Sequence, residues 1–130
     1  MVDINLLASA NVWKYIGMEL AYDSNGLPGV HMVKNEGLKQ YFGGVHGGMI
    51  ATVADTAMAV AVNNALGKDG ATTVEMKINY LQGVTNSDLF SFAKIVKQGK
   101  HLITLTADVI DEQNNLIAMA MGTFMVRPIG

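Results

Sequence analysis

The chain has 130 residues, of which 50% are hydrophobic and only 15% are charged, with a formal net charge of −2. This length supports one domain, expected over residues 1–130, with one hydrophobic core. The composition, which lacks cysteine, excludes a disordered tail, a coiled coil and a disulfide-stapled scaffold, and the acidic balance without a basic stripe argues against nucleic acid.

The first third of the chain predicts short elements joined by turns. Residues 4–13 predict a short helix and residues 15–22 a strand. The sequence Asp-Ser-Asn-Gly at 23–26 predicts a turn, because Asn and Gly tolerate positive φ angles. A second strand is expected over 29–34, and the glycine-containing segment 35–44 is expected to be a loop.

Residues 46–66 predict one long helix, rich in Ala and Met and free of proline. It ends before the glycine-containing stretch 67–70, which favours a helix C-terminus. Apolar residues occupy almost every side of this helix, and Asp55 is its only charged residue. A helix of this kind is buried on most faces, so we expect it at the centre of the fold.

After the helix the hydrophobic period changes to two, which is typical of strands. Residues 72–81 alternate, and the expected apolar face comprises Val74, Met76, Ile78 and Tyr80. Three further strands are expected over 88–98, 101–111 and 116–127. The turns at 99–100 and 112–115 are expected to be hairpins, so the last four strands are expected to form a meander. This order predicts an α+β fold in which an antiparallel sheet wraps around one long central helix.

The apolar stretch inside the helix predicts no membrane span. Residues 49–62 already contain Thr52, Asp55 and Thr56, whereas a spanning helix needs about 20 mostly apolar residues. The N-terminus has no basic region and carries Asp3, so we expect no signal peptide and a cytoplasmic location. The large apolar fraction of so small a chain predicts instead a homo-oligomer.

The segment before the helix carries the candidate catalytic residues. Residues 40–48 read Gln-Tyr-Phe-Gly-Gly-Val-His-Gly-Gly, so backbone N–H groups at the helix start are open to a ligand. The partial positive charge of a helix N-terminus suits a developing oxyanion. Asp55 adds one carboxylate inside the apolar helix, where its position favours a function.

The spacing of His46 and Asp55 predicts a site shared by two subunits. Nine residues of helix advance about 13.5 Å and leave half a turn, so the two side chains point to opposite sides. If both act on one substrate, a second copy of the helix must supply Asp55. Two antiparallel helices related by a two-fold axis satisfy this condition and bury the excess apolar surface.

The runs HGGMIATVADTAMA and TTVEMKINYL resemble the hotdog-fold acyl-CoA thioesterases over roughly residues 15–127. The most similar branch is the phenylacetate-pathway type, and the small human hotdog thioesterases are similar too. The resemblance implies a homodimer whose sheets join, pairing again into a homotetramer, with acyl-CoA at the dimer interface. It implies hydrolysis of the thioester to free acid and CoA, without a metal or a cofactor, since CoA is part of the substrate.

The resemblance also implies a role for each residue of the motif. Gly47 would polarise the thioester carbonyl through its N–H, and His46 would shape the turn and line the pocket. Asp55 of the partner subunit would be the base that activates water, or a direct nucleophile. Thr73 falls where the family has a Ser or Thr that orients the water, and Gln40 where this branch commonly has Asn.

Contacts with the CoA moiety are expected from two regions. One comprises Gly48 at the helix start and Gly83 after the following strand. The other is the local basic cluster of Lys94, Lys97 and Lys100, which suits the phosphates of CoA. The alternative for the lysines is a solubilising strand at a sheet edge.

Two other functions stay open at this point. Hotdog 3-hydroxyacyl dehydratases use a His and an acid differently, but their His loop contains a proline, which residues 43–48 lack. The third possibility is a non-catalytic acyl-CoA binding protein, in which Asp55 is a hydrogen-bonded structural acid and the glycines only allow close helix packing.

Overall fold

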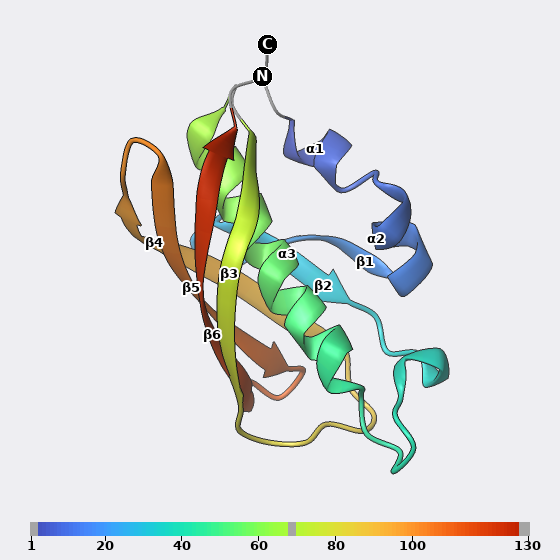
Figure 1. Cartoon of the computed structure of the whole chain (residues 1–130). Helices are drawn as coiled ribbons and strands as arrows, with labels where there is room; N and C mark the ends of the chain where they lie inside the picture. Colours follow the sequence, from blue (N-terminus) through green and yellow to red (C-terminus); the bar gives the residue numbers. More distant parts are fainter. Residues whose placement is uncertain (1–2, 68–69, 128–130) are drawn as a thin grey trace.

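The computed structural model describes residues 3–67 and 70–127, in which a six-stranded antiparallel sheet packs against one long helix (Figure 1). The strand order is β1-β2-β4-β5-β6-β3, so β1 and β3 form the two edges. The strands are β1 (Met18–Tyr22), β2 (Pro28–Met32), β3 (Gly70–Tyr80), β4 (Leu89–Gln98), β5 (Leu102–Asp111) and β6 (Leu116–Arg127). The predicted α+β class, with an antiparallel sheet around one long helix, is confirmed.

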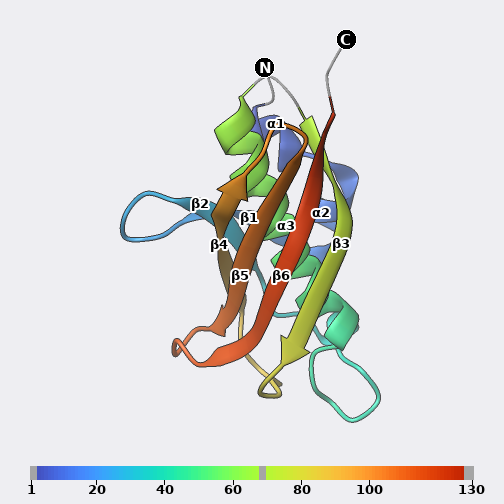
Figure 2. The ribbon, with the colours of Figure 1, turned by 60° about the vertical axis from the view of Figure 1, so that its left-hand side comes forward.

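Helix α3 (Gly47–Leu66) lies in the concave face of the sheet and contacts β2 to β6 (Figure 2). No residue from Gly47 to Asn63 is exposed, as the sequence predicts for a helix apolar on almost every side. The predicted start at residue 46 differs by one residue, because His46 caps the helix from outside. Lys68 and Asp69, in the predicted helix stop, lie outside the described residues.

The apolar length of α3 exceeds the 14 residues that the sequence pattern indicates. Its 20 residues are long and apolar enough, by length and composition alone, to cross a membrane. Half of that stretch is buried within this fold, however, so the apolar character of α3 is that of a core helix.

The N-terminal prediction is partly wrong. Instead of one helix over 4–13 there are two short ones, α1 (Ile4–Leu7) and α2 (Asn11–Ile16), and the strand expected from residue 15 begins only at Met18. Gly17 explains the difference: it ends α2 with a φ of 89° and donates its N–H to the Trp13 carbonyl.

The remaining boundaries agree with the sequence to within a few residues. The turn at 23–26 is confirmed, since Asp23 accepts backbone N–H bonds and Gly26 has a φ of 80°. β2 ends at Met32 rather than residue 34, because the Lys34 N–H is taken by the Asp88 carboxylate. The expected loop over 35–44 contains a short 3-10 helix, η1 (Glu36–Leu38).

Three long strands contain an irregularity that the alternation pattern did not predict. In β3 the register with β6 shifts between Thr73 and Glu75, and in β4 the register with β5 shifts between Ile95 and Lys97. In β6 the register with β5 shifts beside Ile117. The extra residue in β3, Val74, is 55% exposed, whereas simple alternation placed it on the apolar face. A bulge reverses the side to which later side chains point, so it decides which residues of a strand face α3.

Candidate active site

The first turn of α3 leaves one backbone donor free. The His46 carbonyl accepts the N–H groups of Met49 and Ile50, at 2.8 and 3.2 Å. The Gly48 N–H donates to Nδ1 of His46 at 2.9 Å. Within residues 3–67 and 70–127 the Gly47 N–H has no acceptor. Gly47 therefore presents an unused donor at the positive end of a 20-residue helix, where an anionic oxygen is stabilised.

His46 is the N-cap of α3, a role usually filled by Ser, Thr, Asp or Asn. Because Nδ1 accepts the Gly48 N–H, that nitrogen carries no proton and the neutral ring is protonated at Nε2. A Cβ at Gly48 would lie 2.9 Å from Nδ1, so glycine at 48 makes room for the capping ring. The predicted role of His46 in shaping the turn agrees with this geometry, and its role in lining a pocket stays a prediction.

Gln40 closes the loop that precedes the helix. Its backbone N–H donates to the Gly44 carbonyl at 2.7 Å, and its carbonyl accepts from Gly43 at 3.0 Å. Its side-chain Oε1 accepts the Phe42 N–H, so within the chain this oxygen stabilises the loop. The loop exposes Phe42 and Tyr41, whose rings meet edge to face with centroids 5.1 Å apart.

Asp55 and Thr73 form a second candidate catalytic group, beside the free Gly47 N–H at the helix start. The Thr73 hydroxyl donates to Oδ1 of Asp55 at 2.7 Å. Asp55 is half-buried on α3, whereas the sequence placed it in a buried setting. The other carboxylate oxygen has no partner among the described residues, so the pair can orient a further donor such as water.

The β3 bulge makes this contact possible. Met76, Ile78 and Tyr80 lie on the side of β3 that faces α3, and Thr73 would point away from α3 in a strand that alternates without interruption. The extra residue, Val74, shifts the alternation by one position, so the Thr73 side chain points to the helix side of β3 as well.

Tyr80 also contacts the helix, although no sequence motif pointed to a function for it. Its hydroxyl donates to the Gly47 carbonyl at 2.9 Å. Its ring atoms lie 3.4 Å from where a Cβ of Gly47 would be. The one feature of the sequence that could have pointed to Tyr80 is its place as the last inward-facing residue of the strand, near the level of the helix start.

A single chain does not bring the Gly47 N–H and the Asp55–Thr73 pair together. Gly47 and Asp55 are separated by eight residues of continuous helix, or about 12 Å along its axis. The predicted separation of His46 and Asp55 along the helix axis agrees with this distance, since His46 is the N-cap directly before Gly47. That their side chains point to opposite sides stays a prediction. Within one chain, Gly47 and Asp55 cannot contact the same substrate atom.

The residues expected at the CoA moiety lie at opposite ends of the sheet. Gly83 lies in the loop after β3, where the neighbouring Val84 carbonyl accepts the Val45 N–H at 2.8 Å, close to Gly48. Lys97 and Lys100 belong to the β4–β5 hairpin at the other end, since Gln98 pairs with Ile103 (Figure 1). One chain thus does not gather these four residues into one site.

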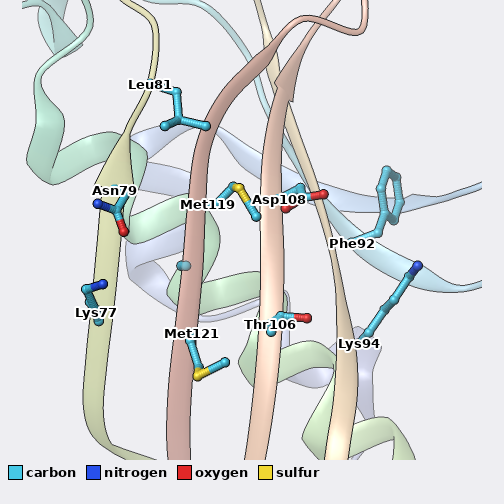
Figure 3. Close-up of a pocket in the computed structure, with 10 residues that line it drawn as sticks. Lys77, Asn79, Leu81, Phe92, Lys94, Thr106, Asp108, Met119 and Met121 are labelled. Atoms are coloured by element: carbon cyan, nitrogen blue, oxygen red, sulfur yellow. The ribbon is translucent and has the colours of Figure 1, made fainter.

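A pocket of about 520 Å³ lies on the outer face of the sheet, with α3 on the other side (Figure 3). It contains none of the predicted catalytic residues, and Met119 and Met121 of β6 occupy its centre. A second, more polar pocket of about 260 Å³ includes Gly83. Neither pocket contains both Gly47 and Asp55, as expected if the reaction centre needs two chains.

Comparison with known proteins assigns the family. The family model of the thioesterase superfamily matches residues 42–118, more than half of the chain. The curated protein "Putative esterase SSO1253" of Saccharolobus solfataricus is 28% identical over 121 residues, covering 93% of this chain and 81% of its own.

Solved structures agree with this assignment. The BH2602 protein of Bacillus halodurans, crystallised with CoA, is 30% identical with a TM-score of 0.88, over 96% of this chain and 87% of that one. The E. coli PaaI protein from the phenylacetic acid degradation operon shares the fold at 22% identity, with a TM-score of 0.84 over 98% of this chain and 90% of that one. Together with the sheet that surrounds α3, these matches establish that the chain belongs to the thioesterase superfamily of hotdog-fold proteins.

Proposed function

We propose that this protein hydrolyses an acyl-CoA thioester to the free acid and CoA, in a site that two subunits share. The observation that carries the proposal is the unused Gly47 N–H at the start of α3, on the same helix as the Asp55 carboxylate that Thr73 orients. The family supports thioester hydrolysis in general. CoA in the crystals of the BH2602 protein supports a CoA thioester as the substrate, and the likeness to PaaI supports the phenylacetate-type branch.

In the proposed reaction, water attacks the thioester carbonyl carbon. Asp55 of the partner subunit accepts a proton from that water while Thr73 holds the carboxylate in place. Negative charge collects on the carbonyl oxygen, which the Gly47 N–H and the helix N-terminus stabilise. The C–S bond then breaks and CoA leaves as a thiolate, which is stable enough that the reaction requires neither a metal nor a cofactor.

A homodimer would supply the missing half of each site. β3 is an edge strand of 11 residues, and such an unpaired edge can pair with a second chain. Antiparallel pairing about a two-fold axis would place the β4–β5 hairpin of one subunit beside the helix start of the other. Lys97 and Lys100 would then approach Gly83 and Gly48 across the interface, as a CoA-binding site requires.

The test is release of free thiol from a panel of acyl-CoA substrates with short, medium and aromatic acyl groups. We expect hydrolysis by the wild-type protein and an at least tenfold lower rate for Asp55→Asn, because the amide still accepts the Thr73 bond but is not a base. Asp108→Asn is the matched control, since Asp108 lies in the outer-face pocket.

Three outcomes would contradict the proposal. CoA binding without thiol release would indicate a binding protein, and interconversion of 3-hydroxyacyl and enoyl thioesters would indicate a dehydratase. An unchanged rate in Asp55→Asn, with the dimer intact, would remove Asp55 from the mechanism.

A further inference from the structure

The geometry of the Gly47–Gly48 peptide points to Tyr80. This peptide is held at both ends, because its carbonyl accepts the Tyr80 hydroxyl at 2.9 Å and its N–H donates to Nδ1 of His46 at 2.9 Å. The preceding peptide, between His46 and Gly47, contains the unused N–H. The two peptides share the Cα of Gly47, so a restraint on one limits the orientation of the other.

Glycine makes this restraint useful. The peptide of the unused N–H is held on one side, since its carbonyl, that of His46, accepts the Met49 and Ile50 N–H groups. Gly47 has no Cβ and is the most permissive residue in φ and ψ, so the junction with the next peptide needs a restraint of its own. The Tyr80 ring packs against Gly47, at 3.4 Å from the position of a Cβ, while its hydroxyl holds the carbonyl. Tyr80 thus supplies both the contact and the hydrogen bond that the glycine lacks by itself.

We propose that Tyr80 is a positioning residue, which aims the Gly47 N–H at the developing oxyanion. The inference rests on the proposed thioester hydrolysis and adds a residue to its machinery. A donor that is oriented before the reaction stabilises transition-state charge without reorganisation, and small misplacements of such groups lower rates strongly. Tyr80 itself contacts the helix backbone and is not a proton donor to the substrate in this proposal.

The first measurement is the steady-state kinetics of Tyr80→Phe, which keeps the ring and removes the hydroxyl. We expect kcat to fall about tenfold and KM to change less than about twofold, because orientation of the donor matters most in the transition state. Tyr22→Phe is the matched control, since Tyr22 is an exposed strand residue whose hydroxyl has no partner among the described residues. A rise in KM with constant kcat would overturn the proposal.

The second measurement combines Tyr80→Phe with Gly47→Pro, which deletes the donor N–H. Proline is well tolerated at the first helical position, and the φ of −59° and ψ of 132° at His46 suit a residue that precedes proline. Gly47→Ala keeps the N–H and serves as the steric control. If Tyr80 acts through this N–H, Tyr80→Phe lowers kcat in the Gly47 protein but has no further effect beside Gly47→Pro. Equal, additive losses in both backgrounds would overturn the proposal.

The third measurement needs no activity. In protein with ¹⁵N-labelled glycine, Tyr80→Phe should shift the Gly47 and Gly48 amide signals and speed hydrogen exchange at Gly48, whose N–H is hydrogen-bonded to His46, whereas Tyr22→Phe should not. Unchanged glycine signals would overturn the role of Tyr80 even in an active enzyme. A wild-type protein that releases no thiol, but shows these shifts, would overturn the hydrolysis proposal and leave the restraint by Tyr80 established.

Discussion

At the scale of single residues, His31 has contacts that its sequence position did not indicate. The sequence placed it within the second predicted strand and assigned it no partner. In the structure Nδ1 lies 2.9 Å from Glu19 and Nε2 lies 2.7 Å from Asp88, so both ring nitrogens face carboxylate oxygens. The ring also stacks on Phe90, with centroids 4.4 Å apart. This cluster joins β1, β2 and the start of β4, where β2 and β4 pair over three residues only.

Asp88 is the acidic residue most affected by this cluster. Burial by itself raises the pKa of its carboxyl group, but the hydrogen bonds from the Lys34 N–H and from His31, with the positive charges of both residues, outweigh burial. The net result is a pKa below the ordinary value for Asp. The ionised Asp88 therefore stabilises the fold at neutral pH, and this contribution is lost as the pH falls through the lowered pKa.

We therefore expect Asp88→Asn to lower the free energy of unfolding by about 1–3 kcal/mol at pH 7. The difference from wild type should shrink in acidic solution, as the pH falls through the lowered pKa of Asp88 and the wild-type carboxyl itself becomes protonated. Urea denaturation at several pH values measures this effect. Asp108→Asn is the control; an Asp88→Asn difference that grows through this acidic range would contradict the assigned stabilisation.

At the scale of elements, the β3 bulge connects strand geometry to the candidate site. Thr73 reaches Asp55 only because the register shift beside Val74 turns its side chain toward α3. We expect the Thr73 hydroxyl to matter for activity through its bond to Asp55, and the packing of Thr73 in the strand to matter less. Two substitutions of nearly constant size separate these two roles.

Thr73→Val removes the hydroxyl and keeps the branched shape, whereas Thr73→Ser keeps the hydroxyl. We expect thiol release to fall about tenfold in Thr73→Val and to change less than threefold in Thr73→Ser, because only the valine variant leaves Asp55 without its hydrogen bond. Steady-state kinetics with one acyl-CoA substrate measure both rates. Similar losses in the two variants would assign Thr73 to strand packing.

The sequence allowed most elements to be predicted because their signals are local. The long helix, the four strands after it and the Asp-containing turn follow from periodicity and turn residues. The register shifts at Val74, Val96 and Ile117 do not follow from periodicity, since alternation assumes that every residue occupies one ladder position. The alternation pattern also predicted Tyr80 on the apolar face. It gave no sign of the hydrogen bond to Gly47, because the two residues lie far apart in the sequence.

At the scale of the whole molecule, the predicted meander of the last four strands is wrong at its first strand. β4, β5 and β6 pair in chain order, but β3 pairs with β6, the last strand, and β2 pairs with β4. These pairings bring distant segments together, and no local pattern specifies them. In contrast, helix geometry alone predicts that one chain cannot bring Gly47 and Asp55 to one substrate atom, because the rise between them is fixed by the helix. The site shared by two subunits stays a prediction, and so does the subunit arrangement.

Mixing two inactive variants tests the shared site directly. Asp55→Asn and Gly47→Pro should each be nearly inactive as homodimers. After exchange of subunits, half of the dimers contain one chain of each kind, and one of their two sites has both intact groups, so we expect about a quarter of the wild-type activity. Thiol release before and after mixing measures this recovery.

The controls for that experiment are the unmixed variants treated in the same way, and native mass spectrometry of the mixture with one variant ¹⁵N-labelled, in which dimers of intermediate mass follow exchange. No recovery after demonstrated exchange would place Gly47 and Asp55 in separate sites and contradict the two-subunit mechanism. Full activity in a monomeric fraction would contradict it as well.

The extra residue in β3 also bears on how this protein can change over evolution. Between Thr73 and Tyr80, many exchanges of one amino acid for another leave both contacts with α3 in place, but loss or gain of a single codon does not. Such a change would turn one of the two side chains toward the solvent face. Relatives that keep both contacts should therefore vary freely in composition here and hold the length of the segment constant.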